Sequence, residues 1–114
     1  MDGAELILLY DYYGDMLTQR QRECFELRYD QDLSLGEIGQ ELGISRQAAH
    51  DNLIRTEALL INMEAKTGCV RRDRQCRKAI REVSDAARRL VDYHDPQVSA
   101  LAKRILDATA CVEE

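Results

Sequence analysis

Apolar residues recur at helical spacing along most of the chain, and no segment shows the alternation typical of a strand. The periodicity predicts helices over residues 4–13, 19–29, 35–42, 46–66, 72–93 and 96–111. Phe25, the only phenylalanine, is expected to anchor the core. The tyrosines Tyr10, Tyr12 and Tyr13 are expected to pack there with their hydroxyls at the surface. The pattern therefore predicts an all-α fold, a helical bundle with long C-terminal helices.

Polar residues mark where several of these helices begin and end. Thr18 followed by Gln21, and Ser34 followed by Glu37, have the spacing of capping boxes. Gly43 follows the third helix at the position where helices commonly end in the left-handed conformation. Asp95-Pro96 is a strong start signal for the last helix.

Residues 34–60 match the pattern of a helix-turn-helix. The first helix carries Gly39 where a side chain would collide with its neighbour, and Ile44 points inward after the turn. Ala49 and Leu53 lie on the buried side of the second helix. A turn glycine allows the two helices to meet at the steep angle that exposes the start of the second one. The alternative is a plain helical hairpin within a bundle.

The exposed face of the second helix carries side chains that can contact base edges and phosphates in a major groove. The predicted nucleic-acid-binding residues are Ser45, Arg46, Gln47, His50, Asp51 and Arg55. For His50, a solvated helix histidine is an equal alternative.

The distribution of charge complicates this prediction. The net charge is −5, and residues 18–65 contain five arginines against nine acidic residues. Affinity for DNA depends mainly on neutralising phosphates with Lys and Arg, and Asp51 would itself face repulsion. DNA binding by this acidic motif therefore stays open. In the alternative function, the motif does not bind DNA and serves as the scaffold of a protein-interaction or dimerisation module.

The positive charge lies downstream, where residues 66–94 contain nine Lys and Arg against four acidic residues. A possible phosphate-binding stripe consists of Arg71, Arg74, Arg77, Lys78 and Arg81. This stripe could instead complement the acidic N-terminal half, within one chain or across a dimer. A simple solvated helix face is the third alternative.

Length and composition limit the remaining possibilities. The 114 residues suffice for one modest domain, read as a helix-turn-helix domain over 1–66 and a helical extension over 67–114 that packs on it or on a partner subunit. No apolar run reaches membrane-spanning length, and the N-terminus does not resemble a signal peptide, so a cytoplasmic location is expected. The four cysteines form no CxxC pair and are expected to be reduced. Because phosphate-loop, nucleophile-elbow and metal-ligand motifs are missing, we expect no enzyme, no metal and no cofactor.

The runs over residues 17–22, 33–39 and 44–49 resemble region four of sigma factors. Three further segments resemble the YlxM family more specifically: the Tyr-Asp-Tyr-Tyr run at 10–13, the Ser-Arg-Gln-Ala run at 45–48 and the Asp-Asn-Leu-Ile-Arg-Thr-Glu-Ala run at 51–58. The resemblance covers roughly residues 5–66. The sequence departs from the family at His50, where an aromatic residue is common.

The YlxM resemblance implies a small bacterial helix-turn-helix protein encoded near genes of the signal recognition particle, with a proposed regulatory role in that pathway. The expected partners are accordingly DNA or the RNA or protein of the signal recognition particle, and a second copy of the chain in a homodimer. No membrane partner is expected.

Overall fold

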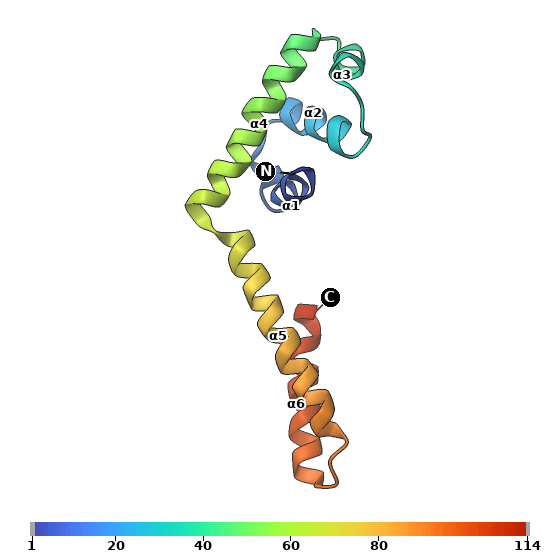
Figure 1. The fold of residues 1–114 in the computed structure, drawn as a ribbon, viewed down its shortest axis with the longest axis vertical. Helices are drawn as coiled ribbons and strands as arrows, with labels where there is room; N and C mark the ends of the chain where they lie inside the picture. The colour runs from blue at the N-terminus through green and yellow to red at the C-terminus, as the bar shows by residue number, and fades with distance from the viewer. Residues whose placement is uncertain (1, 114) are drawn as a thin grey trace. The chain divides into compact units, whose positions relative to one another are not determined.

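The structure is a computed structural model that describes residues 2–113 (Figure 1). The predicted all-α fold is confirmed, because these residues form helices and no strand. The helices are α1 (Gly3–Tyr13), the 3-10 turn η1 (Gly14–Met16), α2 (Gln19–Tyr29), α3 (Leu35–Leu42), α4 (Arg46–Thr67), α5 (Cys69–Val91) and α6 (Pro96–Glu113). Over the described part of the chain, no helix combines the length and the apolarity needed to cross a membrane.

The predicted helix caps are present. The Thr18 hydroxyl accepts from the backbone N–H of Gln21 at 3.2 Å, and the Gln21 side chain accepts from the N–H of Thr18 at 2.9 Å. Ser34 and Glu37 make the same reciprocal pair at 3.1 Å each. The Ser34 N–H, by donating to the carboxylate, lowers the pKa of Glu37. These caps set the starts of α2 and α3.

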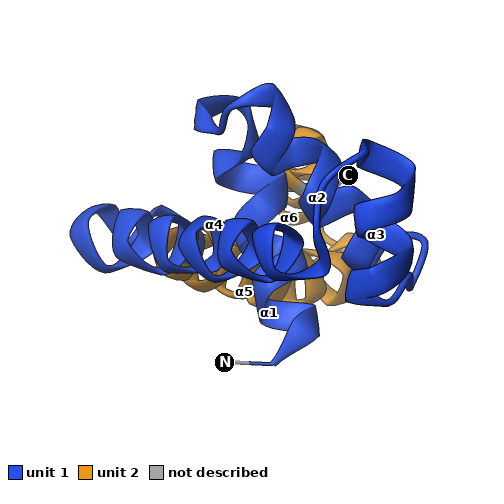
Figure 2. Cartoon of the chain, turned by 90° about the horizontal axis from the view of Figure 1, so that it is seen from above, with its two compact units in different colours: residues 1–70 blue, residues 71–114 orange. Residues whose placement is uncertain are grey.

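The chain divides into two compact units, residues 1–70 and residues 71–114 (Figure 2). In unit 1, α1, α2 and α3 all contact α4 and lie on one side of it (Figure 1). Its core has two parts, one under α1 and one inside the helix-turn-helix. The first comprises Leu6, Leu9, Tyr13, Leu17, Phe25, Leu60 and Val70. The second comprises Cys24, Ile38, Ala49 and Leu53.

Phe25 occupies the centre of the aromatic packing, as predicted. Its ring stacks on Tyr10 with 4.4 Å between centroids and meets Tyr29 at 4.5 Å. The prediction for the other tyrosines was wrong in part. Tyr12 is exposed, whereas Tyr13 is buried and its hydroxyl donates to Glu64 at 2.6 Å. The Glu64 carboxylate on α4 allows the Tyr13 hydroxyl to be buried, because a buried hydrogen-bond donor requires an acceptor.

The hydroxyl of Tyr29 donates to the Glu57 carboxylate and thereby joins α2 to α4. Burial, and then this hydrogen bond to a carboxylate, raise the pKa of Tyr29 to about 12. A raised folded-state pKa means that the stabilisation is complete below the unfolded value of about 10 and is lost as the pH rises toward 12.

We therefore expect the melting temperature of the native chain to fall more steeply between about pH 10 and 12 than that of Tyr29→Phe, which lacks the titrating hydroxyl. At neutral pH this variant should lose about 0.5–1.5 kcal/mol of stability. Thermal unfolding followed by circular dichroism measures both effects. Parallel pH profiles for the two proteins would contradict the expectation.

Helix α5 begins at Cys69, three residues before the predicted start at Arg72. Gly68 ends α4 in the left-handed conformation with φ 64°, so the next helix can follow immediately. Side chains at the end of α4 accept hydrogen bonds from the first backbone N–H groups of α5. Thr67 accepts from Cys69 at 3.4 Å, and Glu64 accepts from Val70 at 3.1 Å. These acceptors replace a conventional N-cap.

Unit 2 is formed by α5 and α6, which run antiparallel. The Arg77 side chain donates to the backbone oxygen of Val112, and Ser84 donates to Thr109 at 2.9 Å. Within residues 71–112 only Ser84, Ala87 and Ala102 are buried. Most of the apolar positions that predicted α5 thus remain exposed or half-buried.

Candidate nucleic-acid interface

The turn between α3 and α4 has the predicted close packing. A Cβ atom on Gly39 would lie 2.7 Å from the backbone oxygen of Ile44, so only glycine fits against this turn. Gly43 ends α3 in the left-handed conformation with φ 68°. Ile38, Ala49 and Leu53 are buried together between the helices. These contacts fix the angle at which the start of α4 projects.

Ser45 is the N-cap of α4. Its hydroxyl accepts from the backbone N–H of Ala48 at 3.0 Å. This bond satisfies one of the donors that a helix start leaves open. Of the six side chains predicted to bind nucleic acid, Ser45 thus also has a structural task.

All six predicted side chains are exposed, and they follow the first three turns of α4. Five of them, all but Ser45, line two surface hollows. Arg46, Gln47 and His50 line the first hollow with Leu35 at the start of α3. Asp51 and Arg55 line the second with Thr18, Gln21, Ala48 and Asn52. The structure therefore brings the predicted residues onto one continuous strip of α4.

Asp51 is the centre of the polar contacts on this strip. The Gln47 amide donates to its carboxylate at 3.0 Å, and His50 Nδ1 lies 3.5 Å from the same oxygen. Arg46 and Arg55 form no ion pair among the described residues. The strip thus offers two arginines to an anionic ligand, while the acid between them is bound to its neighbours.

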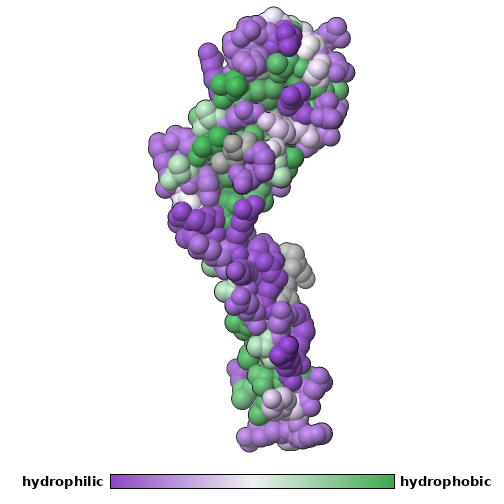
Figure 3. All heavy atoms as spheres, in the orientation of Figure 1, coloured by the Kyte–Doolittle hydropathy of each residue, from purple (hydrophilic) through white to green (hydrophobic). Residues whose placement is uncertain are grey.

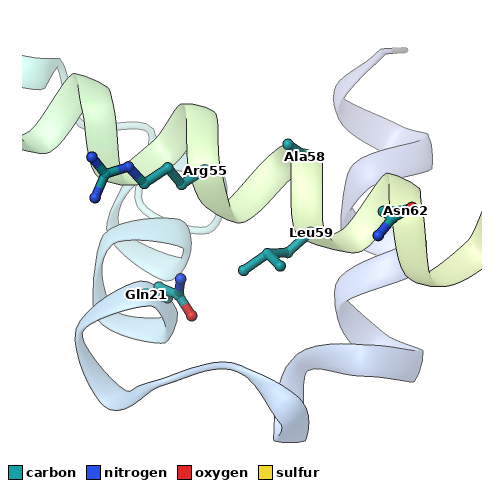
Figure 4. A pocket seen from close by; sticks show the side chains of 5 residues that line it. All are labelled: Gln21, Arg55, Ala58, Leu59 and Asn62. Carbon is teal, nitrogen blue, oxygen red and sulfur yellow. The ribbon is translucent and has the colours of Figure 1, made fainter.

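A shallow apolar groove continues the strip along α4, and the spacing of residues in the sequence did not predict it. Figure 4 shows Leu59 projecting from α4 into the space beside α2, with Arg55 and Asn62 on either side. Gln21 and Ala58 complete the lining. Leu59 directly precedes the buried Leu60 on the helix, yet Leu59 itself is exposed. The spacing of apolar residues does not show this exposure, so the sequence carried no signal for the groove.

The predicted phosphate stripe lies on α5, and its five members are exposed. They differ in their contacts. Arg77 donates to Asp73 at 2.8 Å and to the backbone oxygen of Val112 at 3.0 Å, so it fastens α5 to α6. Arg74 and Arg81 are seven residues apart, which places them on one line of the helix, with Arg88 next on that line. Arg88 on this line pairs with the Asp85 carboxylate at 2.7 Å.

Within residues 2–113 no group of three His, Cys, Asp or Glu side chains is arranged to hold a metal ion. Cys24 is buried, and burial raises the pKa of its thiol above the usual range. The other three cysteines are exposed.

Comparison with known proteins agrees with this geometry. Residues 2–96 match the family model described as "UPF0122: Putative helix-turn-helix protein, YlxM / p13 like". A UPF0122 protein of Desulforamulus reducens is 50% identical over 76 residues, which are 67% of this chain and 65% of the relative. A UPF0122 protein of Thermoanaerobacter sp. is 38% identical over 105 residues, or 91% of this chain and 90% of the relative. One of Geobacillus kaustophilus is 39% identical over 97 residues, 85% and 87% of the two chains.

The family model covers most of the chain, and its description names the motif that the fold contains. The second relative is similar across nearly its full length. The chain belongs to the UPF0122 family of YlxM / p13-like helix-turn-helix proteins.

Proposed function

We propose that this protein is a non-enzymatic regulator that binds nucleic acid through the exposed start of α4. One observation carries the proposal: the helix-turn-helix leaves Arg46, Gln47 and His50 exposed on the first turns of its second helix. In helix-turn-helix proteins these turns enter the major groove. Arginine and amide side chains there can pair with guanine and adenine edges.

The positive charge of the protein limits how strongly it can bind the phosphates of a nucleic acid. Residues 34–60 contain two arginines against four acidic residues, so the motif alone gives weak attraction to phosphates. The stripe of Arg71, Arg74, Arg77, Lys78 and Arg81 adds positive charge on α5. We propose that the α4 strip supplies selectivity and that the stripe supplies most of the salt-dependent affinity.

The YlxM resemblance supports a role in the signal recognition particle pathway. We propose DNA or the RNA or protein of that particle as the partner, and a homodimer as the working form. A helix-turn-helix domain over 1–66 with a helical extension over 67–114, acting in the cytoplasm, fits this role.

A second candidate function is a protein-interaction module that uses the helix-turn-helix as scaffold. The observation in its favour is the exposed apolar surface of α4, where Ile54 and Ile61 face solvent and Leu59 lies in the groove of Figure 4. Exposed apolar patches of this kind often mark protein contacts.

The test is a titration of the protein with duplex DNA and with signal-recognition-particle RNA over a salt series. If the protein binds nucleic acid, the dissociation constant for the DNA or for the RNA should rise steeply with salt concentration. Failure to bind either at low salt would reject the first function and favour the second.

A further inference from the structure

Unit 2 leaves a large part of the apolar surface of its two helices exposed to solvent. Its buried core is limited to Ser84, Ala87 and Ala102 within residues 71–112. Five of its large apolar side chains are solvent-exposed instead. They are Val83 at 48%, Leu90 at 36%, Tyr93 at 62%, Leu101 at 56% and Ile105 at 37%. A helical face of this kind requires another layer to cover it.

Helix α5 has two lines of residues side by side. The line that faces α6 follows residues 77, 80, 84, 87 and 91, with alternating spacings of three and four, and it mixes polar and apolar side chains. A second stripe follows residues 76, 79, 83, 86 and 90, each one position before a member of the first. One residue is a rotation of about 100° on an α-helix. The second stripe therefore lies a quarter turn away from the contact with α6.

Helix α6 repeats this arrangement. Its covered side includes Ala102, Leu106 and Thr109, and its uncovered side includes Leu101, Ile105 and Ala108, again one position earlier. The helices are antiparallel, as the pairings of residue 77 with 112 and of 84 with 109 show. The same rotation on two antiparallel neighbours points both uncovered stripes to one side of the hairpin. Figure 3 shows apolar residues gathered over part of unit 2 between hydrophilic ones.

We propose that a second copy of this chain docks on this face, so that two α5–α6 hairpins form a four-helix bundle. The bundle face is defined as residues 76, 79, 83, 86 and 90 of α5, residues 101, 105 and 108 of α6, and Tyr93. Sustained spacings of three and four residues are the pattern of helices packed in such bundles. The inference deepens the homodimer of the proposed function, and its argument uses unit 2 alone, separately from nucleic-acid binding by α4.

The exposed area suits a second copy. With about 150–250 Å² for one large side chain, the five exposed residues of unit 2 present about 450 Å² per copy. A standard stable interface buries about 800 Å² per partner, of which rather more than half, about 500 Å², is apolar. One hairpin thus offers each partner most of the apolar area that a stable dimer needs.

The charges also permit two identical surfaces to meet. The line of Arg74, Arg81 and Arg88 lies half a turn from the uncovered stripe, so docking does not bring these arginines together. Beside the stripe, the rim carries both signs, with Glu82 and Arg89 on α5. Pairing through the bundle face therefore leaves the basic line exposed to a phosphate ligand.

Light scattering of the full chain, with sedimentation over a concentration series, tests the proposal. The native chain of 13.1 kDa should have a mass of about 26 kDa at micromolar concentration. Leu101→Glu introduces a charge into the bundle face while keeping a residue that favours helices. We expect it to raise the dimer dissociation constant about 100-fold or more, because an unpaired charge is costly to bury.

Two matched variants locate the effect. Met16→Glu changes an exposed apolar residue of unit 1, and Arg81→Glu changes the basic line of α5; both should remain dimeric. Leu101→Ala, which adds no charge, should weaken the dimer by a smaller factor, and the melting temperature of the native chain should rise with concentration. A native chain that stays monomeric at about 100 μM would overturn the proposal. Undiminished dimerisation of Leu101→Glu, or its loss in Met16→Glu, would also overturn it.

Discussion

Gly39→Ala is expected to destabilise unit 1 by about 1–3 kcal/mol, even though alanine is normally the better helix former. The added Cβ atom would lie 2.7 Å from the oxygen of Ile44 and 3.3 Å from the carbonyl carbon of Ser45. Both neighbours are backbone atoms of the turn, so relief requires α3 and α4 to move apart. Urea unfolding followed by circular dichroism measures the loss.

Gly36→Ala is the matched control in the same helix. There the nearest atom to an added Cβ is the Ser34 hydroxyl at 3.9 Å, an ordinary contact. This variant should gain about 0.5–1 kcal/mol, because alanine restricts the unfolded chain without a clash. Equal effects of the two substitutions would contradict the packing described for the turn. Gly39→Ala should also weaken nucleic-acid binding, since it shifts the start of α4.

Phe25→Ala should have the largest effect on stability, about 3–5 kcal/mol, by opening a cavity in unit 1. Phe25 is almost completely buried, and its ring contacts the rings of Tyr10 and Tyr29. Each of these tyrosines also donates to a carboxylate, Glu26 and Glu57 respectively, so the aromatic group joins α1, α2 and α4. Loss of the central ring removes the support of both neighbours.

The comparison with Phe25→Leu separates the cavity from the loss of aromatic contact. Leucine fills most of the volume, so this variant should lose only about 1–2 kcal/mol. Chemical unfolding of the three proteins under identical conditions gives the two differences. A loss below about 1 kcal/mol for Phe25→Ala would show that the ring does not hold the helices together.

The helix-turn-helix could be predicted from the sequence because each of its parts has a local signal. The capping boxes at Thr18 and Ser34 act within four residues, and Gly43 needs only its own backbone conformation. The need for glycine at position 39 was also visible, because the motif places that residue against the following turn.

Other features depend on contacts between residues far apart in the sequence. The hydroxyl of Tyr13 donates to Glu64, which lies 51 positions later in the sequence, and this hydrogen bond explains the burial of Tyr13. Arg77 appeared to be one more member of a basic stripe, yet it fastens α5 to the end of α6. Spacing shows which residues share a helix face, whereas only the fold shows which faces are covered. For this reason the open stripe of unit 2 and the groove beside Leu59 could not be predicted.

The central claim is that the exposed start of α4 contacts nucleic acid, and Arg46 tests it most directly because it is exposed on the first turn and makes no ion pair among the described residues. The decisive measurement is the affinity of Arg46→Ala for the preferred nucleic acid, compared with Arg81→Ala at one low salt concentration. We predict that Arg46→Ala weakens binding about tenfold or more and reduces discrimination between sequences, whereas Arg81→Ala weakens binding to all sequences alike. Native affinity in Arg46→Ala together with lost affinity in Arg81→Ala would contradict the claim and place the contact on α5.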